Sequence, residues 1–422
     1  MNKYVFIFRH TILIFCLLFY IAIPIKADGI DLNKPRYNTN TIVPDDTTTW
    51  TGRMQQTIDS LINLPIFETT QLGLYIFDLT AGRDLVCVNH RHRMRPASCQ
   101  KVVTAVTALG TMGANYQLST RMALTGEVRD NTLWGDITII GGMDPLLSQG
   151  EVEQMARLLN QAGIDSIAGV LRIDLSMKNE DERGWGWCWD DNTVPLLPLM
   201  VEKHDRFVTL FLNSLQSVGI RGLSIDHVVQ DYCPPDARVF CEVNHTVEQV
   251  LQPMMKRSDN FFAESLFYQI AAFGGHRPAG RKDATAYADV IIRSIGLTPS
   301  DYQIADGSGL SLYNYVSPEL LVRLLQYAWQ QEPMRSVLYA SLPIAGVDGT
   351  LEKRMKKTAA ENNVRAKTGT VEGISSLSGY CTSPEGHTLA FCIINQGIRK
   401  TATGRNWQDK VCEVLCGKRG ER

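Results

Sequence analysis

Ser98 and Lys101, three residues apart in a Ser-Cys-Gln-Lys segment, have the spacing of a nucleophile and its base. Side chains three residues apart on a helix lie on the same side, one turn from each other. Burial would disfavour the charged ammonium and lower the lysine pKa, so that a neutral amine could take the serine proton. The segment therefore predicts nucleophilic catalysis, although a helix-capping serine followed by a surface lysine has the same pattern.

A second polar segment, Ser258-Asp259-Asn260, directly precedes an apolar stretch from Phe261 to Ile270. The hydroxyl of Ser258 could pass a proton to a leaving amine, and the amide of Asn260 could hold a substrate. The alternative is a helix cap, a position in which serine, aspartate and asparagine are all common.

A third segment, Lys367-Thr368-Gly369, lies on a strand predicted over Arg365 to Thr370. Lysine and threonine on an edge strand could bind a terminal carboxylate, and glycine there would let a substrate backbone approach closely. The alternative is a solvated edge-strand lysine. Catalysis is favoured because the three segments occur in the order, and on the helix, loop and strand, of the penicillin-recognising serine enzymes.

With these segments the chain resembles a family, the class C low-molecular-mass penicillin-binding proteins, which are D-Ala-D-Ala carboxypeptidases and endopeptidases of the DacB type. The resemblance runs through most of the chain. Its further signs are Pro96-Ala97-Ser98, Gly141-Gly142 with Asp144-Pro145, Trp187 to Asp191, the loop Asp306 to Ser311, and the segment Leu342 to Thr350.

The resemblance implies roles for five side chains. Ser98 would attack the carbonyl of the penultimate D-alanine of a peptidoglycan stem peptide, and Lys101 would take its proton. Ser258 and Lys367 would relay a proton toward the leaving D-alanine, while Asn260 holds the substrate. β-Lactam antibiotics would acylate Ser98 as covalent inhibitors, because their ring mimics the D-Ala-D-Ala bond. This mechanism needs no metal and no organic cofactor.

The resemblance also implies a set of substrate-binding residues. Backbone N–H groups of Ser98 and Thr370 would form the oxyanion hole. Thr368 would help Lys367 to bind the terminal carboxylate. The other residues expected at the cleft are Gly369 on the same strand, Asp306 and Ser308 in the glycine-containing loop, and Glu372.

The elements that must position these residues are predicted at both ends of the chain. Apolar runs at 72–79 and 84–89, separated by a short turn, predict a β-hairpin. Further strands are expected over 365–370, 375–381 and 388–395, and helices over 51–63 and 405–416. The pattern indicates one sheet completed by both ends of the chain.

The predicted fold class is α+β: a β-lactamase/transpeptidase-like domain, with an antiparallel sheet and helices on both faces, carries an inserted, mainly β domain between the first and second catalytic segments. Residues 28–115 plus 250–422 would form the catalytic domain. Residues 116–249, where short strands and turns surround a helix near 205–218, would form the inserted domain.

Residues 1–27 are predicted to be an export signal, because a positively charged start precedes an apolar run and Ala27 offers a cleavage site. The uninterrupted apolar run is shorter than the ~20 residues of a membrane-spanning helix. We therefore expect a secreted, periplasmic protein. In such an oxidising compartment Cys233 and Cys241, which flank a Pro-rich turn, are the best disulfide candidates.

Charge says little about partners. The 42 basic and 44 acidic residues nearly balance, and no basic run indicates a nucleic-acid or lipid surface. Nucleic acid is therefore not an expected partner, while loose membrane association stays open.

Two other functions fit part of the pattern. A class A β-lactamase shares the three segments, but no Glu-x-x-Leu-Asn segment lies between Asn260 and Lys367. A non-catalytic cell-wall binding protein would keep the pocket without turnover, and the unusual Cys99 bears on access to Ser98. The sequence does not separate trimming of the terminal D-alanine from cleavage of crosslinks.

Substrate preference is the first testable expectation. The family often has arginine after the Asp-Gly-Ser-Gly-Leu-Ser loop and glutamine three residues after Lys-Thr-Gly, where this chain has Leu312 and Glu372. Because this exchange removes a positive charge and adds a negative one, we expect faster turnover of stems whose side chain is amidated or amine-terminated. Turnover of free-acid and amidated stems would be compared, and equal rates would contradict the hypothesis.

Overall fold

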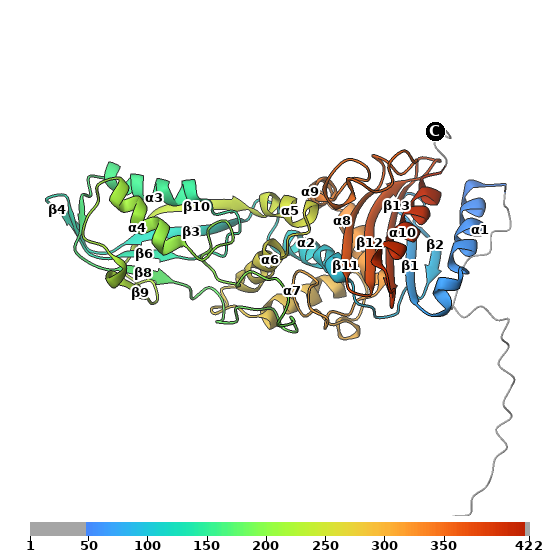
Figure 1. Ribbon diagram of the computed structural model, residues 1–422, viewed down its shortest axis with the longest axis horizontal. Helices are drawn as coiled ribbons and strands as arrows, with labels where there is room; N and C mark the ends of the chain where they lie inside the picture. The colour runs from blue at the N-terminus through green and yellow to red at the C-terminus, as the bar shows by residue number, and fades with distance from the viewer. Residues whose placement is uncertain (1–47, 418–422) are drawn as a thin grey trace, which may run out of the picture. The chain divides into compact units, whose positions relative to one another are not determined.

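The computed structural model describes residues 48–417, so the predicted export signal and Cys16 lie outside the described residues. Its central element is a five-stranded antiparallel sheet in the order β11-β12-β13-β1-β2 (Figure 1). The strands are β1 (Gln71–Asp78), β2 (Arg83–Val88), β11 (Arg365–Val371), β12 (Ile374–Thr382) and β13 (Thr388–Gln396).

Both ends of the described chain complete this sheet, as predicted. The register of β1 and β13 runs from Gln71 opposite Gln396 to Asp78 opposite Leu389. The strand β11, which carries the Lys-Thr-Gly segment, lies at the edge of the sheet. Its outer side therefore has no neighbouring strand in the described sheet, which leaves backbone groups there for other partners.

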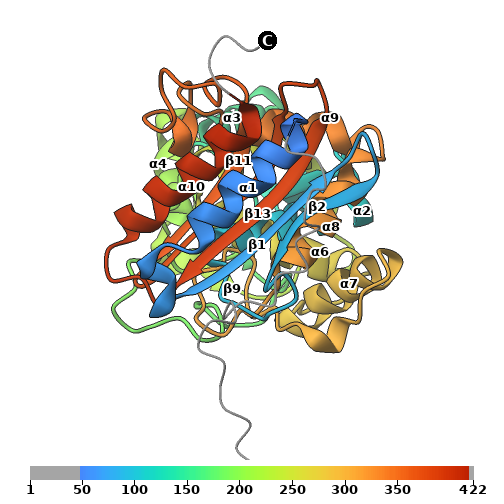
Figure 2. The ribbon, with the colours of Figure 1, turned by 90° about the vertical axis from the view of Figure 1, so that its right-hand side faces the viewer.

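Helices cover both faces of the sheet, which confirms the predicted α+β class. On one face lie α1 (Trp50–Ile62) and α10 (Thr401–Cys416) (Figure 2). Along β1, Leu74 and Ile76 face the core beneath these helices, whereas Tyr75 and Phe77 face the opposite core. The opposite core is formed with α2 (Gln100–Thr111), α5 (Val247–Lys256), α6 (Asn260–Ala272), α7 (Arg281–Ser294), α8 (Pro318–Trp329) and α9 (Met334–Ser341).

Two of these helices, α2 and α6, are buried over most of their length. Every residue of α2 from Gln100 to Leu109 is buried, and so is every residue of α6 from Phe261 to Ala271. Helices that are apolar on nearly every side have no solvent face and pack inside a domain. The first turns of α2 and α6 therefore present Lys101 and Asn260 to a protein interior.

Between α2 and α5 the chain forms a second layered unit. One sheet has the order β10-β3-β6-β8-β9 and a smaller one the order β4-β5-β7. The strands are β3 (Gln117–Leu124), β4 (Glu127–Arg129), β5 (Thr132–Trp134), β6 (Ile137–Ile140), β7 (Ser166–Ile167), β8 (Leu171–Asp174), β9 (Val228–Gln230) and β10 (Arg238–Thr246), with helices α3 (Gln149–Gln161) and α4 (Phe207–Ser217). All these elements fall within 116–249, and those domain boundaries stay a prediction.

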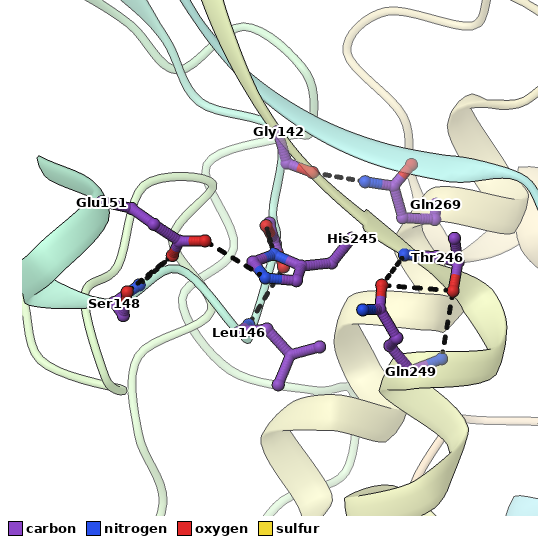
Figure 3. A network of polar contacts seen from close by, with 9 residues as sticks. Gly142, Leu146, Ser148, Glu151, His245, Thr246, Gln249 and Gln269 are labelled. Carbon is purple, nitrogen blue, oxygen red and sulfur yellow. Dashed lines mark hydrogen bonds and ion pairs between the residues drawn. The ribbon is translucent and has the colours of Figure 1, made fainter. Parts of the chain in front are cut away.

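A polar network joins the end of this unit to the helices α5 and α6 (Figure 3). His245 Nδ1 lies 2.7 Å from Asp144 Oδ2, and its Nε2 lies 3.3 Å from Glu151 Oε1. The next residue, Thr246, caps α5 by accepting the N–H of Gln249. On α6, Gln269 donates to the carbonyl of Gly142. The contacts link the segment 142–151 to both helices that flank Ser258.

The predicted disulfide between Cys233 and Cys241 is wrong, because both cysteines are free. Cys233 instead turns its N–H to Asp174, while Cys241 lies in β10 beside a register shift against β3. Among the described residues, no helix is long and apolar enough to span a membrane.

The network at His245 predicts a pH-dependent stability. The Asp144 carboxylate raises the pKa of His245, so the stabilisation is complete below the unfolded-state value of about 6.5 and is lost as pH rises through the higher folded value. Thermal unfolding of wild type and His245→Gln should therefore differ most near pH 6, by roughly 1–3 °C. The difference should shrink toward pH 9. A constant difference, or the same pH response in the exposed-site control His276→Gln, would contradict this assignment.

Candidate active site

Ser98 lies in a tight turn, η2 (Ala97–Cys99), directly before α2. Ala97 has a φ of 47°, in the left-handed region that residues with a Cβ rarely adopt. The carbonyl of Pro96 stabilises the turn by accepting the N–H of Cys99 at 3.2 Å and the hydroxyl of Ser376 at 2.5 Å. Such a backbone costs about 1–3 kcal/mol, so the surrounding sheet must maintain it.

Lys101 occupies the first turn of α2 and is completely buried. Its Nζ lies 3.0 Å from Ser98 Oγ, 2.7 Å from Asn260 Oδ1 and 2.7 Å from the carbonyl oxygen of Ser308. Burial lowers its pKa to about 8, against the opposing charges of Asp306, Glu264 and Asp259. A neutral amine beside the serine is therefore accessible near physiological pH.

Lys367 is the second buried amine of the site. Its Nζ donates to Ser258 Oγ at 2.7 Å and to the carbonyl of Thr368 at 2.7 Å. Burial, followed by the nearby charge of Lys101, lowers the pKa of Lys367 well below its usual value. Ser258 has a φ of 59°, so this second serine also stands in a strained turn. The structure thus brings together two serines and two lysines of reduced basicity.

Asn260 begins α6, and Asp259 caps it by accepting the N–H groups of Phe261 and Phe262. The other carboxylate oxygen of Asp259 pairs with Lys203, which comes from the segment between β8 and α4. The helix-cap interpretation of this segment is therefore correct for Asp259. The cap and the active-site amide coexist, because they use neighbouring residues.

The Lys-Thr-Gly strand packs directly against the serine turn. Cys99 is completely buried and its Sγ donates to the carbonyl of Lys367 at 3.2 Å, so its side chain points into the protein core. A Cβ on Gly369 would stand 2.7 Å from the carbonyl oxygen of Pro96 and 2.2 Å from Ser376 Oγ. Our expectation that this glycine makes space for a substrate needs correction: the space is filled by the chain's own turn.

Further along β11 the side chains become accessible. The hydroxyl of Thr368 is hydrogen-bonded to that of Thr350 at 2.8 Å, and Thr370 and Glu372 are exposed. Thr350 belongs to the segment Leu342 to Thr350 that supported the resemblance. These positions surround the open edge of the strand.

Asp306 and Ser308 were expected among the substrate-binding residues; both are buried, and contact with substrate stays a prediction. Asp306 is 1% exposed and its carboxylate accepts the N–H groups of Gly309 and Ser311, at 2.8 and 2.7 Å. It also accepts the indole N–H of Trp187 at 2.8 Å. Ser308 is fully buried and uses its carbonyl to bind Lys101. Both residues shape the loop beneath the site.

Residues 54–203 and 192–416 match the protein-family model of the D-Ala-D-Ala carboxypeptidase 3 (S13) family. The chain belongs to this S13 family. The match includes every predicted site residue.

Curated relatives agree with the S13 assignment. The chain is 25% identical over 407 residues to D-alanyl-D-alanine carboxypeptidase DacB of Haemophilus influenzae, covering 77% of this chain and 85% of the relative. It is 26% identical to a D-alanyl-D-alanine carboxypeptidase of Actinomadura sp., covering 82% and 81%. The crystal structure of H. influenzae penicillin binding protein 4 superposes with a TM-score of 0.76, at 24% identity over 84% of this chain and 98% of that one. The fold is therefore the one expected.

Sequence reasoning missed several residues of this S13 site. Glu264 is buried on α6, and its signal was a lone acidic residue within an apolar stretch. Lys203 had no local signal, because its partner Asp259 is far along the chain. Within the segment Trp187 to Asp191, the indole N–H of Trp187 donates to Asp306, whereas Trp189 is 86% exposed. Within residues 48–417, no group of three or more His, Cys, Asp or Glu side chains could hold a metal ion.

The position of Lys101 predicts how the S13 site responds to pH. Since the lowered pKa of about 8 makes the amine neutral only above that pH, Ser98 should react with benzylpenicillin faster as pH rises through about 8. At pH 6 the rate should be roughly a hundredfold below its plateau. Stopped-flow acylation from pH 5.5 to 9.5 measures this. A flat profile, or a Lys101→Met variant with wild-type rates, would remove Lys101 from the role of base.

Proposed function

We propose that this protein is a serine-type D-Ala-D-Ala carboxypeptidase, a DD-endopeptidase, or both, acting on peptidoglycan stem peptides through an acyl-enzyme on Ser98. The observation that carries the proposal is the buried Lys101 amine, 3.0 Å from Ser98 Oγ, in a chain of the S13 family. Periplasmic location is part of the proposal, because the substrate lies outside the cytoplasmic membrane.

Acylation begins when the neutral amine of Lys101 takes the Ser98 proton and the serine oxygen attacks the carbonyl of the penultimate D-alanine. The carbonyl oxygen becomes negative in the tetrahedral intermediate. Backbone N–H groups of Ser98 and Thr370 stabilise it, each by a few kcal/mol. The contact of Lys367 with the serine turn, through Cys99, supports this arrangement because it holds β11 beside Ser98.

Collapse of the intermediate breaks the peptide C–N bond and requires a proton on the leaving amine. Lys367 donates to Ser258 Oγ at 2.7 Å, so the two side chains form a relay that ends at a hydroxyl. The terminal D-alanine, or the crosslinked residue in an endopeptidase reaction, leaves protonated. Water then attacks the ester carbonyl, and its proton replaces the one that the relay gave to the leaving amine. As the ester C–O bond breaks, Lys101 returns its proton to Ser98.

Substrate binding relies on the edge strand. A terminal carboxylate placed beside Thr368 and Thr350 would meet two hydroxyl groups. Its negative charge would favour the protonated form of the nearby Lys367. Asn260 serves both the base and the substrate, since its oxygen accepts from Lys101 and its amide nitrogen can donate. Exposed Glu372, at the turn between β11 and β12, supports the proposed preference for less acidic stems.

β-Lactams are the proposed covalent inhibitors. A crystal structure of the H. influenzae relative is described as complexed with a novel β-lactam, and the same lysine-activated serine would open a β-lactam ring here. A stable acyl-enzyme distinguishes this family from a β-lactamase, which releases the drug rapidly.

Intact-mass analysis tests the function. Mature protein exposed to benzylpenicillin should gain one adduct, and a Ser98→Ala variant should gain none. A pentapeptide stem should release D-alanine with wild type, at a rate reduced by at least about 10³-fold in the variant. Melting temperatures of the two proteins would serve as the folding control.

Other outcomes identify the alternatives. Rapid drug turnover without an adduct means a β-lactamase, and an adduct without cleavage of either pentapeptide or crosslinked dimer means a binding protein. Absence of both adduct and turnover would rule out Ser98 as the nucleophile.

A further inference from the structure

Glu264 is a completely buried carboxyl group that the proposed chemistry leaves without a role. It lies one turn after Asn260 on α6, and its oxygens accept the N–H of Ser308 at 2.8 Å and of Gly307 at 3.2 Å. Burial, followed by the charge of Asp306, raises its pKa to about 8. Burying an ionisable carboxyl group costs free energy, and groups with such a shifted pKa often lie at functional sites.

The two N–H groups belong to the turn whose carbonyl binds Lys101. In residues 307 and 308 all four backbone polar groups are bonded by side chains: Thr104 donates to the Gly307 carbonyl at 2.6 Å, and Lys101 donates to the Ser308 carbonyl at 2.7 Å. Glu264 receives both N–H groups. The turn is therefore held between α2 and α6 by three side chains.

The packing leaves this turn no freedom to adjust. A Cβ on Gly307 would lie 2.6 Å from Phe267 Cβ and 2.7 Å from the carbonyl oxygen of Ala263, so the backbone presses against α6. In a trans peptide the carbonyl of one residue points opposite to the N–H of the next. The Ser308 carbonyl therefore shares its peptide with the N–H of Gly309, which Asp306 accepts at 2.8 Å, whereas the N–H of Ser308 that Glu264 accepts belongs to the preceding peptide. Glu264 thus anchors the backbone that enters Ser308, and Asp306 fixes the plane of its carbonyl.

We propose that Glu264 is a positioning residue for acyl transfer, whose carboxyl group anchors the backbone at Gly307 and Ser308 so that the Ser308 carbonyl stays in place to hold the Lys101 amine beside Ser98. The inference rests on the proposed function, since it assigns Lys101 the role of base. Glu264 acts on Lys101 through the turn: its hydrogen bonds go to Gly307 and Ser308, and the Ser308 carbonyl receives the Lys101 amine.

The charge of Glu264 provides a readout that a purely structural role would not change. The groups that face it are Asp306 from the loop, Lys101 from α2 and Tyr268 from its own helix. A cavity of about 300 Å³ reaches Glu264 and Asp306, and the charged residues among its other lining groups are Asp181, Arg183 and Arg281. Because the pKa of Glu264 is itself about 8, the carboxyl group ionises over the same pH range in which Lys101 loses its proton. Its negative charge then raises the pKa of Lys101, so removing that charge should lower the pKa of Lys101.

The test measures benzylpenicillin acylation against pH for wild type, Glu264→Gln and Glu264→Asp. Glutamine offers one acceptor and no charge, so we expect a plateau rate roughly 10- to 100-fold lower and a rise that occurs at lower pH. Aspartate keeps the charge but is shorter, so its rate should fall while the pH of the rise stays close to that of wild type. Ser265→Ala is the matched control, because its neighbouring hydroxyl is buried on the same helix without a partner among the described residues.

The outcomes separate the two proposals. Wild-type protein that forms no Ser98 adduct refutes the proposed function. Normal wild-type acylation with an unchanged Glu264→Gln profile refutes only the positioning role. A slower Glu264→Gln variant whose pH profile matches wild type also refutes it, because loss of packing alone lowers the rate without moving the profile. If Glu264→Gln fails to fold by circular dichroism and thermal unfolding, Glu264→Asp decides: an unchanged rate overturns the role.

Discussion

The burial of two lysine amines without a carboxylate in direct contact is the constraint on which the rest of this structure depends. Lys101 and Lys367 are both fully buried, and their hydrogen-bond partners are hydroxyl, amide and carbonyl oxygens. Neutral acceptors satisfy the ammonium hydrogens yet do not stabilise the charge as an ion pair would. Burial therefore disfavours the protonated form of both amines, which makes it easier for either nitrogen to give up a proton.

Maintaining that environment explains much of the surrounding fold. The helices α2 and α6 are apolar on nearly all sides, and they exclude water from the base of the site. Strained backbone at Ala97 and Ser258 lies where elements meet, at η2 against β11 and at the start of α6. The bond from Cys99 to Lys367 and the close contact at Gly369 join the first and third catalytic segments. Stability and reactivity are thus supplied by the same contacts.

Much of this arrangement could be predicted because its signals are local. The apolar run of β1, and an α2 that is apolar on nearly every side, indicate a strand and a buried helix from the sequence alone. Each of the three segments with predicted site residues is contiguous in sequence, and each lies on the kind of element that was predicted. In contrast, Lys203 and Asp259 pair across 56 positions, and Gly369 is packed by Pro96 from the other end of the chain. Such contacts depend on the tertiary fold, so a single sequence does not reveal them.

The pairing of β1 with β13 has a consequence for the order in which the protein folds. Gln71 and Gln396 are 325 positions apart, and the strand that carries Lys367 reaches β1 only through β12 and β13. Contacts of such long sequence separation form late, because closing a long loop costs entropy before any pairing compensates. The active site therefore assembles only after nearly the whole chain is present. A partly synthesised chain therefore contains the serine segment but lacks the strands that place Lys367 beside it.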